Sequence, residues 1–147
     1  MIALRLVHLI ENHSDELAAG LLKKFRTSPH TRDLQKVPAG ELRDRSYEIY
    51  RNLSDWLLHT KEEELERCYV KVGARRASQG VALSDLCWGI VLTKEHLWSF
   101  LQEQGYLNSP VEIFGELELL RLLDQFFDKA LCYATVGYEQ ARMAKVA

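Results

Sequence analysis

The chain has 147 residues, of which 47% are hydrophobic and 27% are charged, values typical of one soluble domain with a substantial core. Its formal net charge of −2 gives no electrostatic attraction to nucleic acid or to an anionic membrane, so neither is expected as a partner. Cys68, Cys87 and Cys132 are far apart, which excludes a disulfide framework and zinc-ligand spacing and favours a cytoplasmic location.

The spacing of apolar residues predicts a single all-α domain of five or six helices, because no stretch alternates with the period of a strand. The first segment forms one helix, or two if Ser14 starts a new one after the polar run at Asn12. Gly80 is a suitable left-handed terminator for the third segment. The fourth is apolar all round near its start, which favours a central position. The expected helical segments cover residues 2–27, 38–59, 61–78, 84–104 and 109–142.

The last segment has the strongest helical signal. It opens with a serine cap at Ser109, a proline at the first helical position and Glu112 placed to close a capping box. Its apolar residues cover an arc about twice the ~100° stripe of an ordinary surface helix. One face is expected to enter the core, and the second to pack against another copy of the chain. The residues assigned to this second face, and so to a homodimer interface, are Leu119, Leu122, Phe126, Ala130 and Tyr133.

A charged residue lies on the apolar stripe of the third segment. Helical geometry places Arg76 on the same side as Tyr69. It either holds an anionic ligand, or reaches the surface or pairs with a carboxylate at the edge of the core, such as Asp124. The aromatic residues, Trp88 among them, either line a small-molecule pocket or belong to the core. Tyr69, Arg76 and Trp88 are therefore the candidate ligand or signal pocket.

The stretch from residue 69 to 85 is the most informative about family. A helix with the basic pair Arg75-Arg76 ends at Gly80, and a short apolar link leads to the cap of the next helix. This order resembles the N-terminal sensory domain of RsbR/RsbRD-type stressosome proteins and of related sensor kinases. Other segments that share the resemblance are Leu9–His13, Pro38–Leu42, Leu53–Leu57 and Leu97-Trp98.

The resemblance implies a globin-like domain without haem. Related globin sensors have a similar Val/Ile-Gly element with the iron-binding histidine three residues after the glycine, and here Gly73 is followed at that spacing by Arg76. Arginine stays protonated and is not an ordinary haem ligand. No cofactor is therefore expected. In the alternative, the chain is a haem- or small-ligand-binding sensor that acts alone, with His96 as the next candidate near iron.

The function implied by the resemblance is that of a non-enzymatic sensory and dimerisation domain in bacterial signal transduction. Helix repacking at a homodimer interface would pass the signal to an output partner, either a STAS domain (a phosphorylatable sulfate-transporter/anti-sigma-antagonist module) or a kinase. The residue patterns are consistent with this. The five histidines lack the ligand set of a metal site, and the motifs Ser-x-x-Lys and Gly-x-Ser-x-Gly are missing. No apolar run is long enough to span a bilayer.

Overall fold

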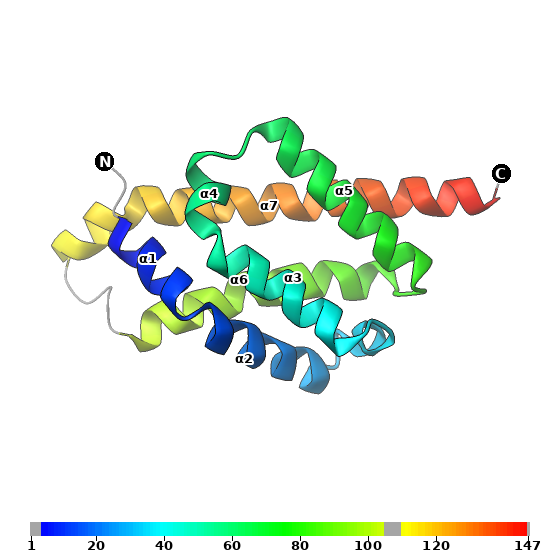
Figure 1. The fold of residues 1–147 in the computed structure, drawn as a ribbon, viewed down its shortest axis with the longest axis horizontal. Coiled ribbons are helices and arrows are strands. Elements are labelled where there is room, and N and C mark those ends of the chain that lie inside the picture. Colours follow the sequence, from blue (N-terminus) through cyan, green and yellow to red (C-terminus); the bar gives the residue numbers. More distant parts are fainter. Residues whose placement is uncertain (1–3, 105–109, 147) are drawn as a thin grey trace.

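The computed structural model describes residues 4–104 and 110–146, with side chains from 5 to 104 and from 117 to 144 (Figure 1). The all-α class is confirmed. The described residues form seven α-helices, more than the five or six expected, because two of the predicted helices are each divided. In chain order, with one 3₁₀-helix labelled η1, the elements are α1 (Leu4–Asn12), α2 (Ser14–Thr27), η1 (Arg32–Lys36), α3 (Ala39–Arg51), α4 (Leu53–Leu58), α5 (Glu62–Ser78), α6 (Leu83–Glu103) and α7 (Pro110–Val146).

Both divisions occur at polar residues that leave helical dihedral angles. His13 (φ −111°, ψ 20°) separates α1 from α2, and its Nδ1 lies 2.9 Å from the carbonyl oxygen of the residue four before it. Asn52 (φ −110°, ψ 28°) separates α3 from α4 and donates from Nδ2 to the Glu48 carbonyl at 3.1 Å. Such local hydrogen bonds compete with helix formation. The two-helix alternative with a start at Ser14 is therefore confirmed, and the single helix predicted over 38–59 is wrong.

The predicted helix ends differ in outcome. Gly80 has φ +77°, which confirms it as the left-handed residue that follows α5. The serine cap predicted at Ser109 lies outside the described residues, as do the side chains of its capping box. α7 itself begins at Pro110, as expected for a proline at the first helical position.

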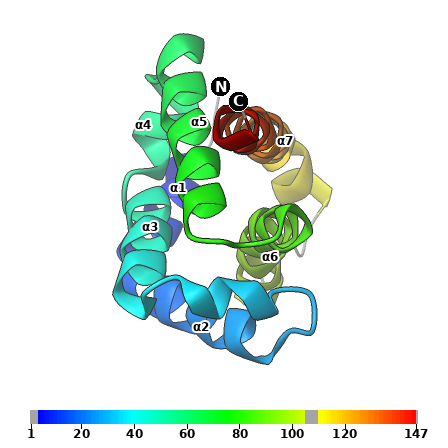
Figure 2. The same cartoon turned by 90° about the vertical axis from the view of Figure 1, so that its right-hand side faces the viewer.

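The helices enclose one shared core. Figure 2 shows α5 and α7 together on one side and α2 below, with α3 and α6 on the two flanks. α5 packs on α7, and α2 packs on α3, while α6 contacts α2, η1, α5 and α7. α6, which was expected to be central, contacts four other elements and lies on one flank of the arrangement in Figure 2. Fully buried side chains come from most of the helices, among them Leu6, Leu21, Tyr50, Leu53, Leu97 and Leu119.

The closest helix contact is the crossing of α5 and α7. A Cβ on Gly73 of α5 would lie 1.8 Å from the carbonyl oxygen of Ala134 on α7. A Cβ on Gly137 of α7 would lie 2.0 Å from the carbonyl oxygen of Val70 on α5. The two backbones therefore touch at a point where only glycine fits on each side.

The second apolar face predicted for the last helix is mostly inside the same chain. Leu119, Phe126 and Ala130 are at most 4% exposed and belong to the core. Phe126 packs against the rings of Trp56 of α4 and Tyr69 of α5, at centroid distances of 5.6 and 5.9 Å. These three residues of the predicted dimer interface are therefore buried within the chain, and α4 and α5 cover Phe126. The other two residues of the assigned set, Leu122 and Tyr133, are half-buried.

The glycine crossing predicts a large loss of stability when Gly73 is replaced by alanine. The new methyl group meets backbone rather than a flexible side chain, so the two helices must separate. We expect the free energy of unfolding to fall by about 3 kcal/mol or more, measured by urea denaturation.

Gly40→Ala is the matched control, because a Cβ there meets nothing within 4 Å. Alanine has the better helix propensity, so the stability of this variant should be unchanged or higher. Equal stability of the two variants would show that α5 and α7 do not approach as closely as described.

Candidate functional site

A buried arginine marks the inner side of α5. Arg76 is 4% exposed and lies on the buried side of α5 with Tyr69. Its Nη1 donates to Glu41 Oε2 at 2.6 Å and to Gln79 Oε1 at 2.9 Å. Burial lowers the pKa of the Arg76 guanidinium, and the carboxylate of Glu41 opposes that shift. An arginine remains charged under these conditions, so α5 carries a fixed positive charge at the edge of the core.

The partner of this arginine differs from the carboxylate suggested by the sequence. Asp124 lies 3.7 Å from Lys94 Nζ and is half-exposed. Glu41, in the first turn of α3, takes its place, so the charge of Arg76 is neutralised by a residue of the neighbouring helix α3. Of the two alternatives considered for Arg76, the structure shows pairing with a carboxylate.

Glu41 joins the start of α3 to the end of α5. Its Oε1 accepts hydrogen bonds from Nε and Nη2 of Arg75 at 2.9 and 2.6 Å, and its Oε2 accepts one from Gln79 Nε2 at 2.7 Å as well as that of Arg76. Partial burial would raise the pKa of Glu41, but the hydrogen bonds from Arg75, Gln79 and Arg76 outweigh it and lower the pKa to about 2. Position in the first turn of a helix also favours the anion.

A second arginine, Arg45, lies on α3 one turn after Glu41 and faces α5. Arg45 Nη2 pairs with Glu48 at 2.7 Å, and its Nη1 lies 3.5 Å from Cys68 Sγ. Its guanidinium carbon is 5.9 Å from the centre of the Tyr69 ring. Arg45 Nε and the Tyr69 hydroxyl are both buried without a hydrogen-bond partner. We define the α3–α5 seam as the line of Glu41, Arg45, Cys68, Tyr69, Arg75, Arg76 and Gln79.

A small cavity of about 60 Å³ lies behind the seam and is enclosed by α2, η1, α3, α5 and α6. That volume has room for about two water molecules. Most of its walls are apolar, and the polar side chains along it are Arg45, Ser46, Tyr69, Arg76 and Thr93. Ser46 and Thr93 donate to carbonyl oxygens of their own helices. Arg45 Nε and the Tyr69 hydroxyl are the unsatisfied groups among these five, so a polar ligand would find two donors here.

Of the three residues predicted for a pocket, the structure brings two together. Tyr69 and Arg76 both line the small cavity. Trp88 is 38% exposed on the outer side of α6, where its ring stacks on His30 at a centroid distance of 4.0 Å. Its neighbour Gly89 faces the cavity instead. The all-round apolar sequence of α6 gives no signal that separates the inner from the outer side.

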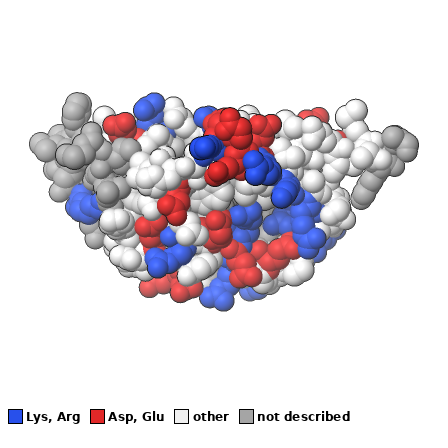
Figure 3. Space-filling view, turned by 45° about the horizontal axis from the view of Figure 1, so that its top comes forward, with Lys and Arg blue, Asp and Glu red and all other residues white. Residues whose placement is uncertain are grey.

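The outer side of the seam opens into a groove of about 500 Å³, which we call the basic groove. Two carboxylates, Glu41 and Glu64, and the less polar side chains Cys68 and Val72 also line it. Figure 3 shows acidic side chains gathered at the N-terminal end of α5 and basic side chains following the helix toward its other end. The cationic side chains that line the groove are Arg45, Arg67, Lys71, Arg75 and Arg76.

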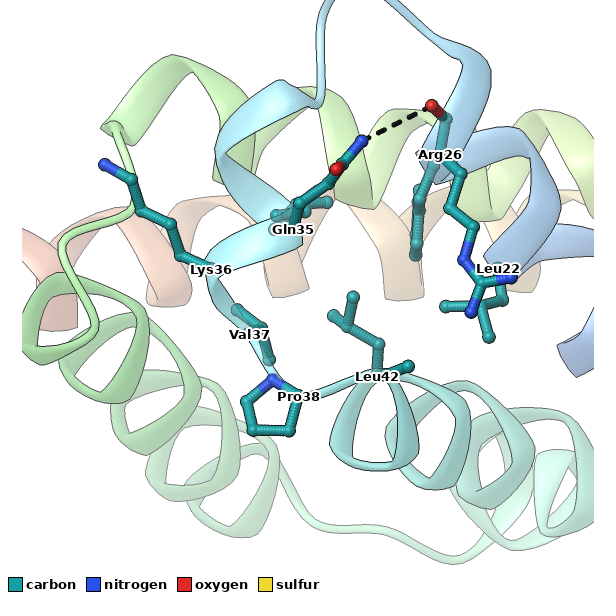
Figure 4. Close-up of a pocket in the computed structure, with 10 residues that line it drawn as sticks. Leu22, Arg26, Gln35, Lys36, Val37, Pro38 and Leu42 are labelled. Atoms are coloured by element: carbon teal, nitrogen blue, oxygen red, sulfur yellow. Dashed lines mark hydrogen bonds between the residues drawn. The ribbon is translucent and has the colours of Figure 1, made fainter.

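A further pocket of about 460 Å³ lies between α2, η1 and the start of α3 (Figure 4). Arg26 and Lys36 lie on opposite sides of it, and Gln35 Nε2 donates to the Arg26 carbonyl at 3.5 Å. Leu34 and Leu42 line both this pocket and the small cavity. Two surface pockets therefore flank the same buried space.

The histidine considered for iron does not face this space. His96 Nε2 is 3.0 Å from the Leu17 carbonyl oxygen, and its Nδ1 is buried without a partner. Burial lowers the pKa of His96, with Lys24 adding to the shift. Among the described residues, no three His, Cys, Asp or Glu side chains lie close enough to hold a metal ion. Across the same ranges, each helix is too short or too polar to cross a bilayer.

The sequence reading missed Glu41, Arg45 and Gln79. Arg45 belongs to the charge run Arg43-Asp44-Arg45, a pattern that is typical of a solvated face. The sequence does contain a pattern that could have identified Glu41 and Arg45. They are four residues apart and lie together beside the buried Leu42 and Ser46 on the helical wheel. That pattern indicates that one edge of the predicted inward face is charged.

The lowered pKa of Glu41 predicts a pH-dependent contribution to stability. A carboxyl group whose pKa falls from 4.5 to about 2 on folding stabilises the protein fully above pH 4.5 and loses this effect as the pH falls toward 2. Glu41→Gln should lower the free energy of unfolding by about 2 kcal/mol at pH 7, because charge-assisted hydrogen bonds are lost. Denaturation measured from pH 7 to pH 2.5 should show the gap between the two proteins closing.

Glu139→Gln removes the same charge from an exposed position of α7 and serves as the control. It should follow the wild type at every pH. A gap between wild type and Glu41→Gln that does not change with pH would mean that the carboxylate is not held by the arginines.

Comparison with known proteins gives one family. A family model described as the RsbT co-antagonist protein rsbRD N-terminal domain matches residues 15–145. Searches of curated proteins and of solved structures found no match. The match covers nearly all helices described above, including the whole α3–α5 seam. This chain therefore belongs to the RsbRD N-terminal domain family, a stressosome-type signalling domain.

Proposed function

We propose that this chain is a non-enzymatic sensory domain of stressosome-type signalling, which receives a signal at the α3–α5 seam and passes it on by a shift of helices. The observation that carries this proposal is the composition of the seam. A charged hydrogen-bond cluster around Glu41 bridges α3 and α5, and Arg45 of α3 adds a hydrogen bond to Cys68 Sγ of α5. The main packing partners of the two helices lie elsewhere, because α3 packs on α2 and α5 packs on α7.

The α3–α5 seam joins two pairs of packed helices, α2 with α3 and α5 with α7. Its charged contacts suit a shift of one pair relative to the other. Hydrogen-bonded ion pairs have defined geometry and can exchange partners, whereas a close-packed apolar interface resists displacement. A guest molecule that alters the pairs at Arg45 or Arg76 would therefore move α5 relative to α3. Because α5 and α7 touch backbone to backbone at Gly73 and Gly137, they are expected to move together.

We further propose that two copies pair through the outer side of α7. Of the five residues predicted for the dimer interface, Leu122 and Tyr133 remain in this proposal, because the other three are buried in the core. Apolar side chains that remain on the outer side of α7 are Leu117, Val136 and Met143, which are 49%, 42% and 72% exposed. A second copy would cover them, and the pairing would bring the two α7 helices into contact.

In this scheme the output partner is a STAS-domain protein or a kinase, and α7 is the element that it reads. The support is the family match together with the position of α7, which runs the length of the molecule in Figure 1. The haem-binding alternative finds little support in the donor set, because a guanidinium lines the cavity and His96 binds a backbone carbonyl.

Light scattering on the purified chain tests the dimer. Leu122→Glu combined with Val136→Glu places two like charges on the outer side of α7 without entering the core. We expect the molar mass to fall from that of a dimer to that of a monomer, with the helical circular dichroism signal retained.

Trp88→Glu is the matched control, since it introduces a charge at an exposed apolar residue on α6. It should leave the dimer intact. A wild-type chain that is monomeric at all concentrations, or a double variant that remains dimeric, would contradict pairing through α7.

A further inference from the structure

We propose that the basic groove binds a small phosphate-bearing anion, with Arg67, Lys71 and Arg75 as its first contacts. This inference deepens the proposed function and rests on it, because it names the class of signal that the α3–α5 seam receives. The groove has a volume of about 500 Å³, within the range of small-molecule sites.

The charge of the groove selects an anion. Five cationic side chains line it against the two carboxylates of Glu41 and Glu64, although the chain as a whole has a formal net charge of −2. Like charges in one groove repel each other and concentrate the positive potential between them. The ligand that relieves this repulsion carries negative charge.

The spacing of the exposed cations favours a dianion. Arg67, Lys71 and Arg75 follow one another at four-residue intervals and so lie along one side of α5. Within the described residues, Arg67 and Lys71 take part in no ion pair, while Arg75 is paired with Glu41 and has a side chain that is 60% exposed. Cations four residues apart on a helix are mutually destabilising, and one phosphate group between them replaces repulsion by attraction.

Most of the residues that line the groove are charged, with their aliphatic stems forming part of its wall. Apart from the charged residues, the side chains that line it are Cys68 and Val72, both half-buried. Affinity must therefore come from charge and from directed hydrogen bonds, as arginine gives to phosphate oxygens. A phosphate monoester or a diphosphate meets this requirement better than a long-chain carboxylate, which needs an apolar wall along its length.

The surroundings limit the size of the anion. The N-terminal end of α5 bears Glu62, Glu63, Glu64 and Glu66. Figure 3 shows acidic side chains gathered beside the basic ones in this region. A nucleic acid strand that extended along α5 would meet these carboxylates. A compact anion that lies between Arg67 and Arg75 meets only Glu64 of these four, because Glu64 alone of them lines the groove.

Binding would act on the seam through Arg75. A phosphate group at Arg75 competes with Glu41, whose Oε1 accepts both hydrogen bonds from that side chain. Glu41 would then be held by Arg76 and Gln79 alone, and the link between α3 and α5 would loosen. Arg45 also lines the groove, and its buried Nε has no hydrogen-bond partner among the described residues.

Isothermal titration calorimetry with inorganic diphosphate tests the proposal on the whole chain at constant ionic strength. We expect saturable binding by the wild type. The variant Arg67→Gln/Lys71→Gln removes two exposed cations, so its affinity should fall about tenfold or more. Lys23→Gln/Arg51→Gln removes two exposed cations from α2 and α3 outside the groove and should bind like the wild type.

Several results would overturn the proposal. One is the absence of saturable diphosphate binding by the wild type. Another is equal diphosphate affinity of the two double variants, and a third is tighter binding of a single-stranded oligonucleotide than of diphosphate. Light scattering on the same samples separates this inference from the proposed function. A monomeric chain that binds diphosphate at the groove contradicts the dimer alone, and a dimer that does not bind diphosphate contradicts the ligand alone.

Discussion

The contact on which the rest of the structure depends is the crossing of α5 and α7 at Gly73 and Gly137. Two glycines allow the backbones to meet, and this contact fixes which sides of α5 face α7, the core and α3. Tyr69 lies four residues before Gly73 and Arg76 three residues after it, so both project from the side of α5 that borders the cavity. If the helices were separated by a methyl group at either glycine, these side chains would no longer reach their present partners.

The pairing of Arg76 with Glu41 is better understood as a constraint on arrangement than as a source of stability. Removing a guanidinium from water costs several kcal/mol, and a buried ion pair repays this only when its hydrogen bonds are well placed. Here Glu41 accepts four, from Arg75, Arg76 and Gln79. An apolar seam of the same shape would hold α3 and α5 together equally well, but it would have no charged group with which a ligand could interact.

The sequence predicted what depends on local periodicity. The all-α class, the left-handed residue at Gly80 and the inward position of Arg76 follow from the chemistry of neighbouring residues. The partner of Arg76 could not be predicted in this way, because Glu41 is 35 residues away and helix periodicity carries no information about which helix lies opposite. The double apolar face of α7 was recognised for the same local reason. Periodicity could not show that part of this face packs inside the chain, where α4 and α5 cover Phe126.

The two ends of α5 carry opposite charges and contact different parts of the molecule. At its C-terminal half, the basic residues face α3 and the groove. At its N-terminal end, Glu62 accepts hydrogen bonds from Lys129 Nζ at 2.9 Å and from the Tyr133 hydroxyl at 2.5 Å, and this bond raises the pKa of Tyr133 to about 12. Tyr133 is also one of the two residues of the predicted interface that remain half-exposed on α7. α5 is one continuous helix that touches α7 at the glycine contact. In the proposed mechanism, a displacement of α5 at Arg75 would therefore be transmitted to Glu62 and its partners on α7.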